Sequence, residues 1–167
     1  MSYITSLVPV CPMRSEATHR SEQVSQLLFG EVGEVSETTK DFSKIKCLYD
    51  GYEGWCQTSQ LIELSGEVAG IKETFLVKEW VKEISINNSP IYIPFGSSVS
   101  LFKNGIFKTD KHEAFYEGEA FNTRENNFDE ETIKWLSYKY LNTSYMWGGK
   151  SVFGVDCSGF SLSLIHI

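Results

Sequence analysis

Short alternating segments separated by turn residues run through most of this chain, and they constrain its fold more than any other feature. Residues 44–47 alternate polar and apolar side chains, which is the period of a half-buried strand. Asp50-Gly51 lies between apolar flanks, and Asn104-Gly105 lies between residues 99–103 and 106–108, so each pair predicts a tight hairpin turn. Closely spaced short strands without a long helical pattern predict small barrels or sandwiches.

A second segment, weakly similar in sequence to the first β-unit, follows it. Residues 91–97 parallel residues 27–31, and two similar units at such spacing suggest tandem domains. We assign these domains to residues 1–63 and 64–124. Residues 78–84 fit either a helix or a strand.

The pattern becomes helical after residue 126. Asn127 followed by Glu130 is a capping-box pair, and apolar residues, Leu136 and Tyr140 among them, then recur on one helical face. We therefore expect a helix that begins at Asn127 and ends near Asn142, a residue type that tolerates the left-handed cap conformation.

Composition and charge exclude several classes of protein. The chain of 167 residues has 15 Lys and Arg against 22 Asp and Glu, a net charge of −7 that disfavours nucleic-acid binding. No apolar run approaches the ~20 residues of a membrane span. The four cysteines are widely spaced without a CxxC pair, so we expect no zinc site, disulfide framework or cofactor.

The start of the chain lacks a secretory pattern, which predicts a cytoplasmic location. An upstream signal peptide would instead imply a periplasmic or extracellular location.

One segment near the end has the character of a catalytic turn. Gly148, Gly149 and Gly154 permit a tightly folded backbone just before Asp156 and Cys157. If Asp156 caps a helix, the thiolate of Cys157 is favoured by the helix N-terminus, whose N–H groups can also stabilise an oxyanion. A buried core thiol is the alternative interpretation of this cysteine. We expect Cys47 and Cys56 to be core thiols in strands and Cys11 to lie in a loop.

Two sets of motifs resemble a known family. Tyr145-Met146-Trp147-Gly148-Gly149 followed by Asp156-Cys157-Ser158-Gly159-Phe160 resembles the opening of the NlpC-type papain-like cysteine peptidases of bacterial cell-wall metabolism. Residues 29–31 and 50–55 resemble the first bacterial SH3 domain of one subgroup, the γ-D-glutamyl-L-diamino acid endopeptidases (dipeptidyl-peptidase VI). The resemblance implies a mainly β chain, with two tandem SH3-like small barrels followed by the first helices of a truncated α+β papain-like domain at residues 125–161.

The resemblance also implies a reaction. These enzymes cleave the bond between γ-D-glutamate and diaminopimelate or lysine in muropeptides that carry a free N-terminal L-alanine.

The same resemblance implies roles for six residues. Cys157 would be the nucleophile and Tyr145 would line the oxyanion region. Asp156 and Ser158 would contact the L-Ala-γ-D-Glu portion of the substrate, while Glu31 and Tyr52 would bind its free α-amine. We expect Lys150 to be an ordinary solvated lysine.

The general base is not evident in the sequence. The family places its histidine after the nucleophile, whereas His19 and His112 lie in the β-domains. His166 on the same helix as Cys157 would be ~13 Å away along the axis, too far for a hydrogen bond. We expect the chain as written to be inactive, and the residues beyond about 125 to be poorly anchored without a sheet to pack on.

Residues 162–167 resemble the translation of a transposon-end sequencing adaptor, which predicts that the native sequence differs from the given one after about Ser161. A natural helix end is the alternative.

Two other functions remain open for the protein: an exported cell-wall D,L-endopeptidase of broader specificity, and a non-catalytic SH3 wall-binding module.

Overall fold

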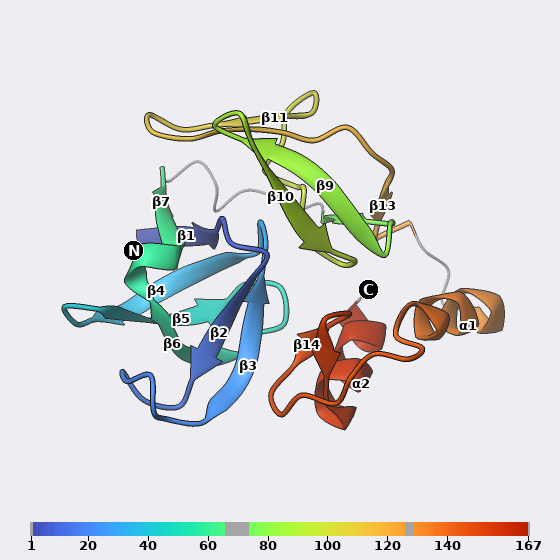
Figure 1. The fold of residues 1–167 in the computed structure, drawn as a ribbon, viewed down its shortest axis with the longest axis horizontal. Coiled ribbons are helices and arrows are strands. Elements are labelled where there is room, and N and C mark those ends of the chain that lie inside the picture. Colours follow the sequence, from blue (N-terminus) through green and yellow to red (C-terminus); the bar gives the residue numbers. More distant parts are fainter. Residues whose placement is uncertain (1, 66–73, 126–128, 167) are drawn as a thin grey trace.

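The chain folds into two β-units with a small helical lobe beside both of them (Figure 1). The computed structural model describes residues 2–65, 74–125 and 129–166. Strands dominate these residues, so the mainly β part of the predicted fold class is confirmed. None of the helices described is long and apolar enough to cross a membrane.

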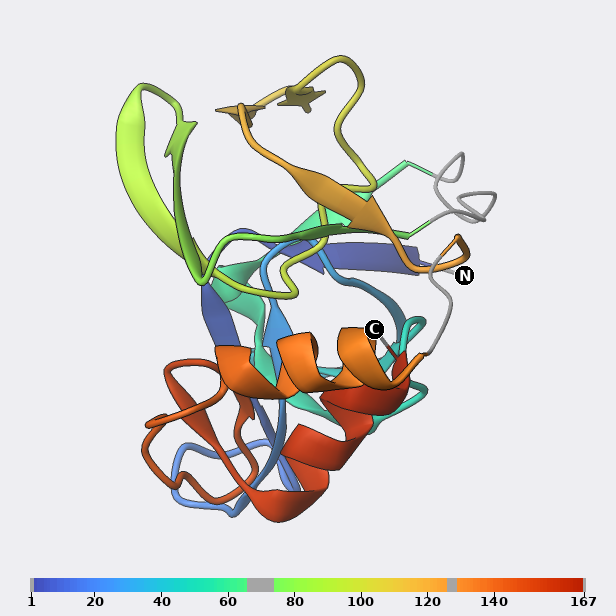
Figure 2. The ribbon, with the colours of Figure 1, turned by 90° about the vertical axis from the view of Figure 1, so that its right-hand side faces the viewer.

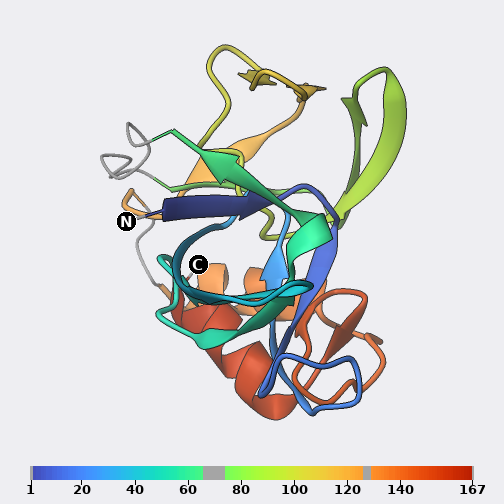
Figure 3. The same cartoon turned by 90° about the vertical axis from the view of Figure 1, so that its left-hand side faces the viewer.

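The first unit is a single antiparallel sheet in the order β3-β2-β6-β5-β4-β1-β7. The sheet is strongly curled (Figure 3). Its elements are β1 Ser2–Ser6, β2 Val10–Arg14, β3 Gln23–Leu28, β4 Val32–Thr38, β5 Phe42–Cys47, β6 Glu53–Gln57, a 3-10 turn Thr58–Gln60 and β7 Leu61–Leu64.

The interior of this sheet bears out much of the sequence pattern. The predicted strand at residues 44–47 lies in β5, whose side chains alternate between the core and the surface as expected. Gly51 adopts a φ of 73°, so the Asp50-Gly51 turn is confirmed. Cys47 and Cys56 are fully buried core thiols as predicted. The loop expected around Cys11 is wrong, because β2 alternates and turns this thiol into the core between Val10 and Pro12.

The second unit contains two smaller sheets. One has four strands in the order β10-β9-β12-β11, and the other pairs β13 with β8. The strands are β8 Phe75–Val77, β9 Val81–Ile86, β10 Ser89–Pro94, β11 Ile106–Lys108, β12 Glu113–Phe115 and β13 Ala120–Asn122. The ambiguous segment 78–84 therefore leads into a strand. Because the strand order differs from that of the first unit, the tandem-barrel arrangement and the domain boundaries stay predictions.

The predicted hairpin around Asn104-Gly105 is only partly correct. Both residues have the positive φ that the turn requires, 52° and 77°. Residues 99–103, however, form no strand; a single bridge joins Lys103 to Ile106, and β11 pairs with β12 instead. The start of this segment bonds to distant residues instead: the Ser98 amide donates to the Phe29 carbonyl and the Val99 amide donates to the Phe75 carbonyl, each at 2.8 Å.

The helical lobe comprises α1 Glu130–Lys139, β14 Lys150–Ser151, β15 Gly154–Val155 and α2 Cys157–His166. Asp129 caps α1 by accepting a hydrogen bond of 2.8 Å from the Thr132 amide, so the helix begins later than predicted. Asn127 lies outside the described residues. The helix ends at Lys139, and Asn142 adopts a left-handed φ of 66° just beyond it.

An aromatic cluster fixes this lobe on the second unit, so the expectation that residues beyond 125 are poorly anchored is wrong. Phe95 is fully buried and its ring contacts Phe121, Trp135 and Tyr140. Leu136 is also fully buried in this cluster. Figure 2 shows α1 lying between the second unit and α2, where Leu136 becomes buried although Ile133 of the same helix stays 43% exposed.

Truncation of the central ring tests this anchoring. Phe95→Ala is expected to lower the free energy of unfolding by about 3–5 kcal/mol, because the cavity borders both the second unit and α1. Urea denaturation followed by circular dichroism measures the change. Tyr92→Ala is the control, since Tyr92 is 55% exposed and its loss is expected to cost less than about 0.5 kcal/mol. Similar losses in the two variants would show that Phe95 does not anchor the lobe.

Candidate active site

Cys157 is the first residue of α2 and is exposed, which places its thiol at a helix N-terminus as predicted. Asp156 caps this helix. One of its oxygens, Oδ1, accepts hydrogen bonds of 2.7 Å from the Gly159 amide and from the Ser158 hydroxyl. The other, Oδ2, accepts one of 2.8 Å from the Gly148 amide. The carboxylate therefore ties the glycine loop to the turn that carries the cysteine.

These contacts control the protonation of Asp156. Burial alone would raise the pKa of its carboxyl, but hydrogen bonds from Gly159, Ser158 and Gly148 stabilise the carboxylate and lower the pKa below its ordinary value. The carboxylate stays charged at neutral pH and reinforces the helix start beside Cys157.

Glycine is required where the loop and the helix meet. A Cβ on Gly159 would lie 2.0 Å from the Gly149 carbonyl oxygen, which is an impossible contact. Gly148 adopts a φ of 67°, which favours glycine, and a Cβ there would lie 2.4 Å from the Gln23 carbonyl oxygen. The close backbone approach that the glycine pattern predicts is therefore present.

The segment before Cys157 also docks onto the first sheet. Trp147 donates its indole N–H to Glu22 at 2.7 Å, and its carbonyl accepts a hydrogen bond of 2.9 Å from the Gln23 amide group. The Lys150 amide donates to Gln26 Oε1 at 2.9 Å. The nucleophile turn is thus held by β3 and by the loop before it.

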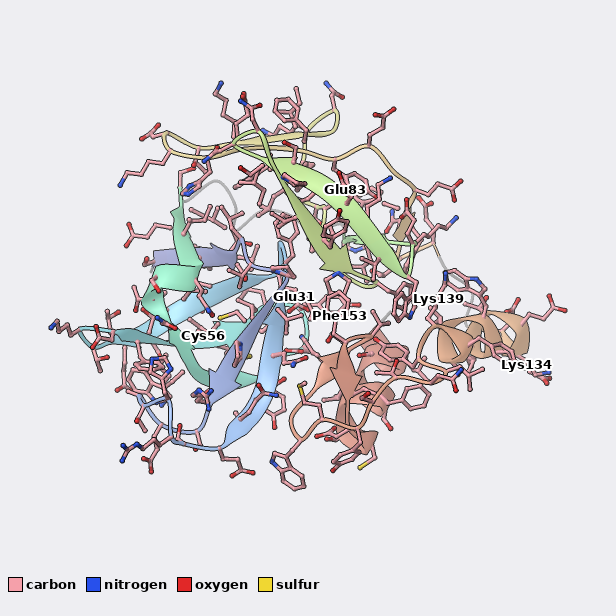
Figure 4. All side chains as sticks on the ribbon, in the orientation of Figure 1. Glu31, Cys56, Glu83, Lys134, Lys139 and Phe153 are labelled. Carbon is pink, nitrogen blue, oxygen red and sulfur yellow. The ribbon has the colours of Figure 1, made fainter. Side chains whose placement is uncertain are left out.

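Lys150 is the centre of a buried ion-pair cluster, and the expectation that it is solvated is wrong. Its ammonium lies 2.9 Å from Glu31 Oε1 and 2.7 Å from Asp50 Oδ2. The three side chains are at most 6% exposed. Figure 4 labels Glu31 where the first sheet meets the β14 hairpin. The turn residues Glu31 and Asp50 each follow a buried strand, and this is the sequence signal that could have suggested a partner for Lys150.

The pKa values of the cluster reflect competition between burial and charge. Burial raises the pKa of Glu31, and the nearby ammonium only partly offsets this. For Asp50 the ammonium outweighs burial and lowers the pKa. Burial alone would lower the pKa of Lys150, but the carboxylates of Glu31 and Asp50 raise it above its ordinary value. The lysine is therefore charged at neutral pH.

The same cluster contains the donor atoms of a potential metal site. Ligand atoms of Glu31, Cys47 and Asp50 lie within 4.8 Å of one another. Both carboxylates, however, pair with the Lys150 ammonium. The cation that these carboxylates bind in this structure is therefore the Lys150 ammonium.

The predicted substrate residues fall into two groups. Glu31 is 3% exposed, and its other oxygen, Oε2, accepts the Leu28 amide at 2.7 Å, so both oxygens have partners within the protein. The oxygens of Asp156 are likewise occupied. Tyr145 and Ser158 are exposed, and Tyr52 is half-buried. The substrate-binding roles of all five residues stay predictions, but the last three side chains are more accessible to a peptide.

No hydrogen bond joins a histidine to Cys157 among the described residues. His19 packs edge-on against Phe42 with ring centroids 4.9 Å apart. His112 lies at the turn between β11 and β12, where its amide donates to the Thr109 hydroxyl. Neither β-domain histidine therefore fills the role of a general base here.

Comparisons with known proteins agree with this geometry. Residues 13–61 match the bacterial dipeptidyl-peptidase SH3 domain. No curated protein matches the chain significantly. Among solved structures, an NlpC/P60 family protein from Bacillus cereus superposes with a TM-score of 0.75 at 16% identity, over 98% of this chain and 71% of that one. An NlpC/P60 endopeptidase from Photobacterium damselae superposes with a TM-score of 0.64 at 16% identity, over 98% of this chain and 42% of that one.

The chain therefore has a fold similar to that of the NlpC/P60 structures, and its residues 13–61 match a bacterial SH3 domain. The SH3 match lies within the first sheet, which contributes Glu31 and Asp50 to the ion-pair cluster. The NlpC/P60 likeness extends over the helical lobe as well. The resemblance of the nucleophile motif is therefore accompanied by a matching fold.

Thiol labelling tests the environment of Cys157. Of the four cysteines, only Cys157 is exposed; Cys11, Cys47 and Cys56 are buried. One thiol per native chain is expected to react rapidly with a chromogenic disulfide reagent, and all four are expected to react after denaturation. Cys157→Ala is expected to abolish the rapid reaction. Rapid reaction of two or more native thiols would contradict the structure.

Removal of the cap tests the role of Asp156. Asp156→Ala is expected to lower stability by about 1 kcal/mol at pH near 7. Because folding lowers the pKa of this carboxyl, its contribution is present above the ordinary value of 3.8 and is lost as the pH falls through the folded-state pKa. Urea denaturation at several pH values measures whether the stabilities of the wild type and Asp156→Ala become equal at low pH. Asp110→Ala, at an exposed position, is the control; equal effects of the two changes would argue against the cap.

Proposed function

We propose that this chain is part of a cysteine peptidase that hydrolyses bacterial cell-wall peptides. The observation that carries the proposal is the exposed Cys157 at the start of α2, braced by the Asp156 cap. The NlpC/P60 fold and the SH3 match support the cell-wall assignment. The proposal includes a cytoplasmic location, which fits the four free cysteines.

The proposed chemistry is nucleophilic catalysis at Cys157. Its thiolate would attack the carbonyl carbon of the scissile amide and form a thioester. Backbone N–H groups at the start of α2, with the adjacent Tyr145, would stabilise the oxyanion. A histidine would take the thiol proton and return it to the leaving amine before water releases the acyl group. We propose that this histidine lies outside the part of the chain that the structure describes.

The finer proposal concerns the bond that is cleaved. We infer that the substrate is an L-Ala-γ-D-Glu-diamino acid peptide and that the γ-D-Glu bond to diaminopimelate or lysine is hydrolysed. Its support is the sequence resemblance, together with the position of the first sheet directly beside the Cys157 turn. Tyr52, Tyr145 and Ser158 are the side chains we propose for direct peptide contacts.

One observation favours a second candidate. Glu31, which would bind the free α-amine of L-alanine, is already paired with Lys150 in the buried cluster. An enzyme that does not select for a free amine would leave that carboxylate to its internal partner. We therefore retain an endopeptidase of broader specificity as the alternative.

Mass spectrometry of peptide cleavage tests both candidates. The protein made from the complete reading frame is expected to cleave L-Ala-γ-D-Glu-diaminopimelate between its last two residues. Cys157→Ala is expected to abolish cleavage, whereas Cys56→Ala, at a buried thiol, is the matched control. Equal activity of wild type and Cys157→Ala would exclude the proposed nucleophile.

A second substrate separates the candidates from each other. The same tripeptide with its amine acetylated is expected to be cleaved much more slowly if the free amine is recognised. The protein group that binds the amine would then be shielded from water without a partner. Equal rates on the free and acetylated peptides would favour the broader endopeptidase. For the 167-residue chain alone, we expect no turnover of either peptide.

A further inference from the structure

Lys150 occupies the junction between the first sheet and the helical lobe. It begins β14, in the hairpin that leads directly into Cys157. Its amide donates to Gln26 of the first sheet at 2.9 Å. Its carbonyl accepts hydrogen bonds from the Tyr140 hydroxyl at 3.3 Å and from the Ser163 hydroxyl at 3.2 Å. The main chain of Lys150 is therefore fixed from both sides of the interface.

The side chain of Lys150 is aimed at two carboxylates that are themselves fixed. The Leu28 amide orients Glu31 through Oε2, and the Tyr52 amide orients Asp50 through Oδ1 at 3.0 Å. The remaining oxygen of each carboxylate faces the ammonium. Two preoriented carboxylates define a single position for the lysine nitrogen, and Asp50 connects that position to the backbone of Tyr52.

The contacts that Trp147 makes across this interface are less buried than the cluster. Trp147 is 62% exposed, so its hydrogen bonds to Glu22 and Gln23 lie at the rim, where water competes for the same groups. The Lys150 side chain is 6% exposed. A buried charge tolerates little displacement from its partners, since any gap leaves it neither solvated nor paired. The cluster therefore determines the spacing of the interface more strictly than the rim does.

We propose that Lys150 is a positioning residue that holds the β5–β6 turn, which carries Tyr52, against the Cys157 turn, and that this spacing selects which peptide ends reach the thiol. The first half of the proposal concerns the fold alone. The second half rests on the proposed peptidase function. Removal of the ammonium would leave the two buried carboxyl groups of Glu31 and Asp50 without their charge partner, so the interface would lose the ion pairs that set its spacing.

Hydrogen exchange monitored by mass spectrometry tests the first half in the chain itself. Lys150→Met is expected to increase amide exchange in residues 146–157 by about tenfold, with protection in residues 81–94 retained. Lys44→Met is the matched control, because Lys44 pairs with Glu37 at 3.2 Å on the surface, and it is expected to leave both segments unchanged.

Two results would overturn this half of the proposal. One is a folded Lys150→Met protein whose exchange in residues 146–157 matches that of the wild type. The other is equal acceleration in residues 81–94, which would show general destabilisation without a positioning role.

A second variant keeps the test decisive if Lys150→Met does not fold. Combining Glu31→Gln, Asp50→Asn and Lys150→Met removes all three charges at similar volume, so no unpaired buried charge remains. This variant is expected to fold and still to exchange faster in residues 146–157. Wild-type exchange in that segment would show that packing alone sets the interface.

Peptide selectivity tests the second half in the protein made from the complete reading frame. Lys150→Met is expected to reduce the ratio of kcat/KM for the free-amine tripeptide over the acetylated one by about tenfold. An equal loss on both peptides, or an unchanged ratio, would overturn the selectivity role. If the wild type cleaves neither peptide, the proposed function fails and the selectivity role falls with it, while the exchange measurement still decides whether Lys150 positions the interface.

Discussion

The buried ammonium of Lys150, held between the carboxylates of Glu31 and Asp50, is the interaction on which the arrangement of this protein depends. It joins two turns of the first sheet to the hairpin that carries the nucleophile. Burying three charged groups carries a large desolvation cost, which is offset only when all three meet in one geometry. The positioning role that we propose for Lys150 follows from this requirement.

This arrangement changes how the candidate site is understood. Glu31 and Asp156 were the acidic residues expected to hold substrate, and both are engaged by the protein itself. Asp156 builds the helix start beside the thiol, and Glu31 pairs with Lys150 of the hairpin that leads into Cys157. Peptide recognition is left to more accessible side chains, among which Tyr52, Tyr145 and Ser158 are the ones we propose.

A second constraint comes from the aromatic cluster around Phe95. Its ring joins the second β-unit to α1 through Trp135 and Tyr140. The lobe that carries Cys157 is therefore supported by the second unit through apolar packing and by the first unit through ion pairs. The sequence suggested poor anchoring because the helical pattern of α1 shows which face is apolar but does not show what covers it.

The sequence by itself determined the features set by a few neighbouring residues. The half-buried strand β5, the turns at Asp50-Gly51 and Asn104-Gly105 and the Asp156 cap follow from local φ preferences and short-range hydrogen bonds. Only the tertiary structure decided the partner of Lys150, the burial of Leu136 and the loss of the strand at residues 99–103. Each of these depends on groups far apart in the chain, whose meeting no local pattern encodes.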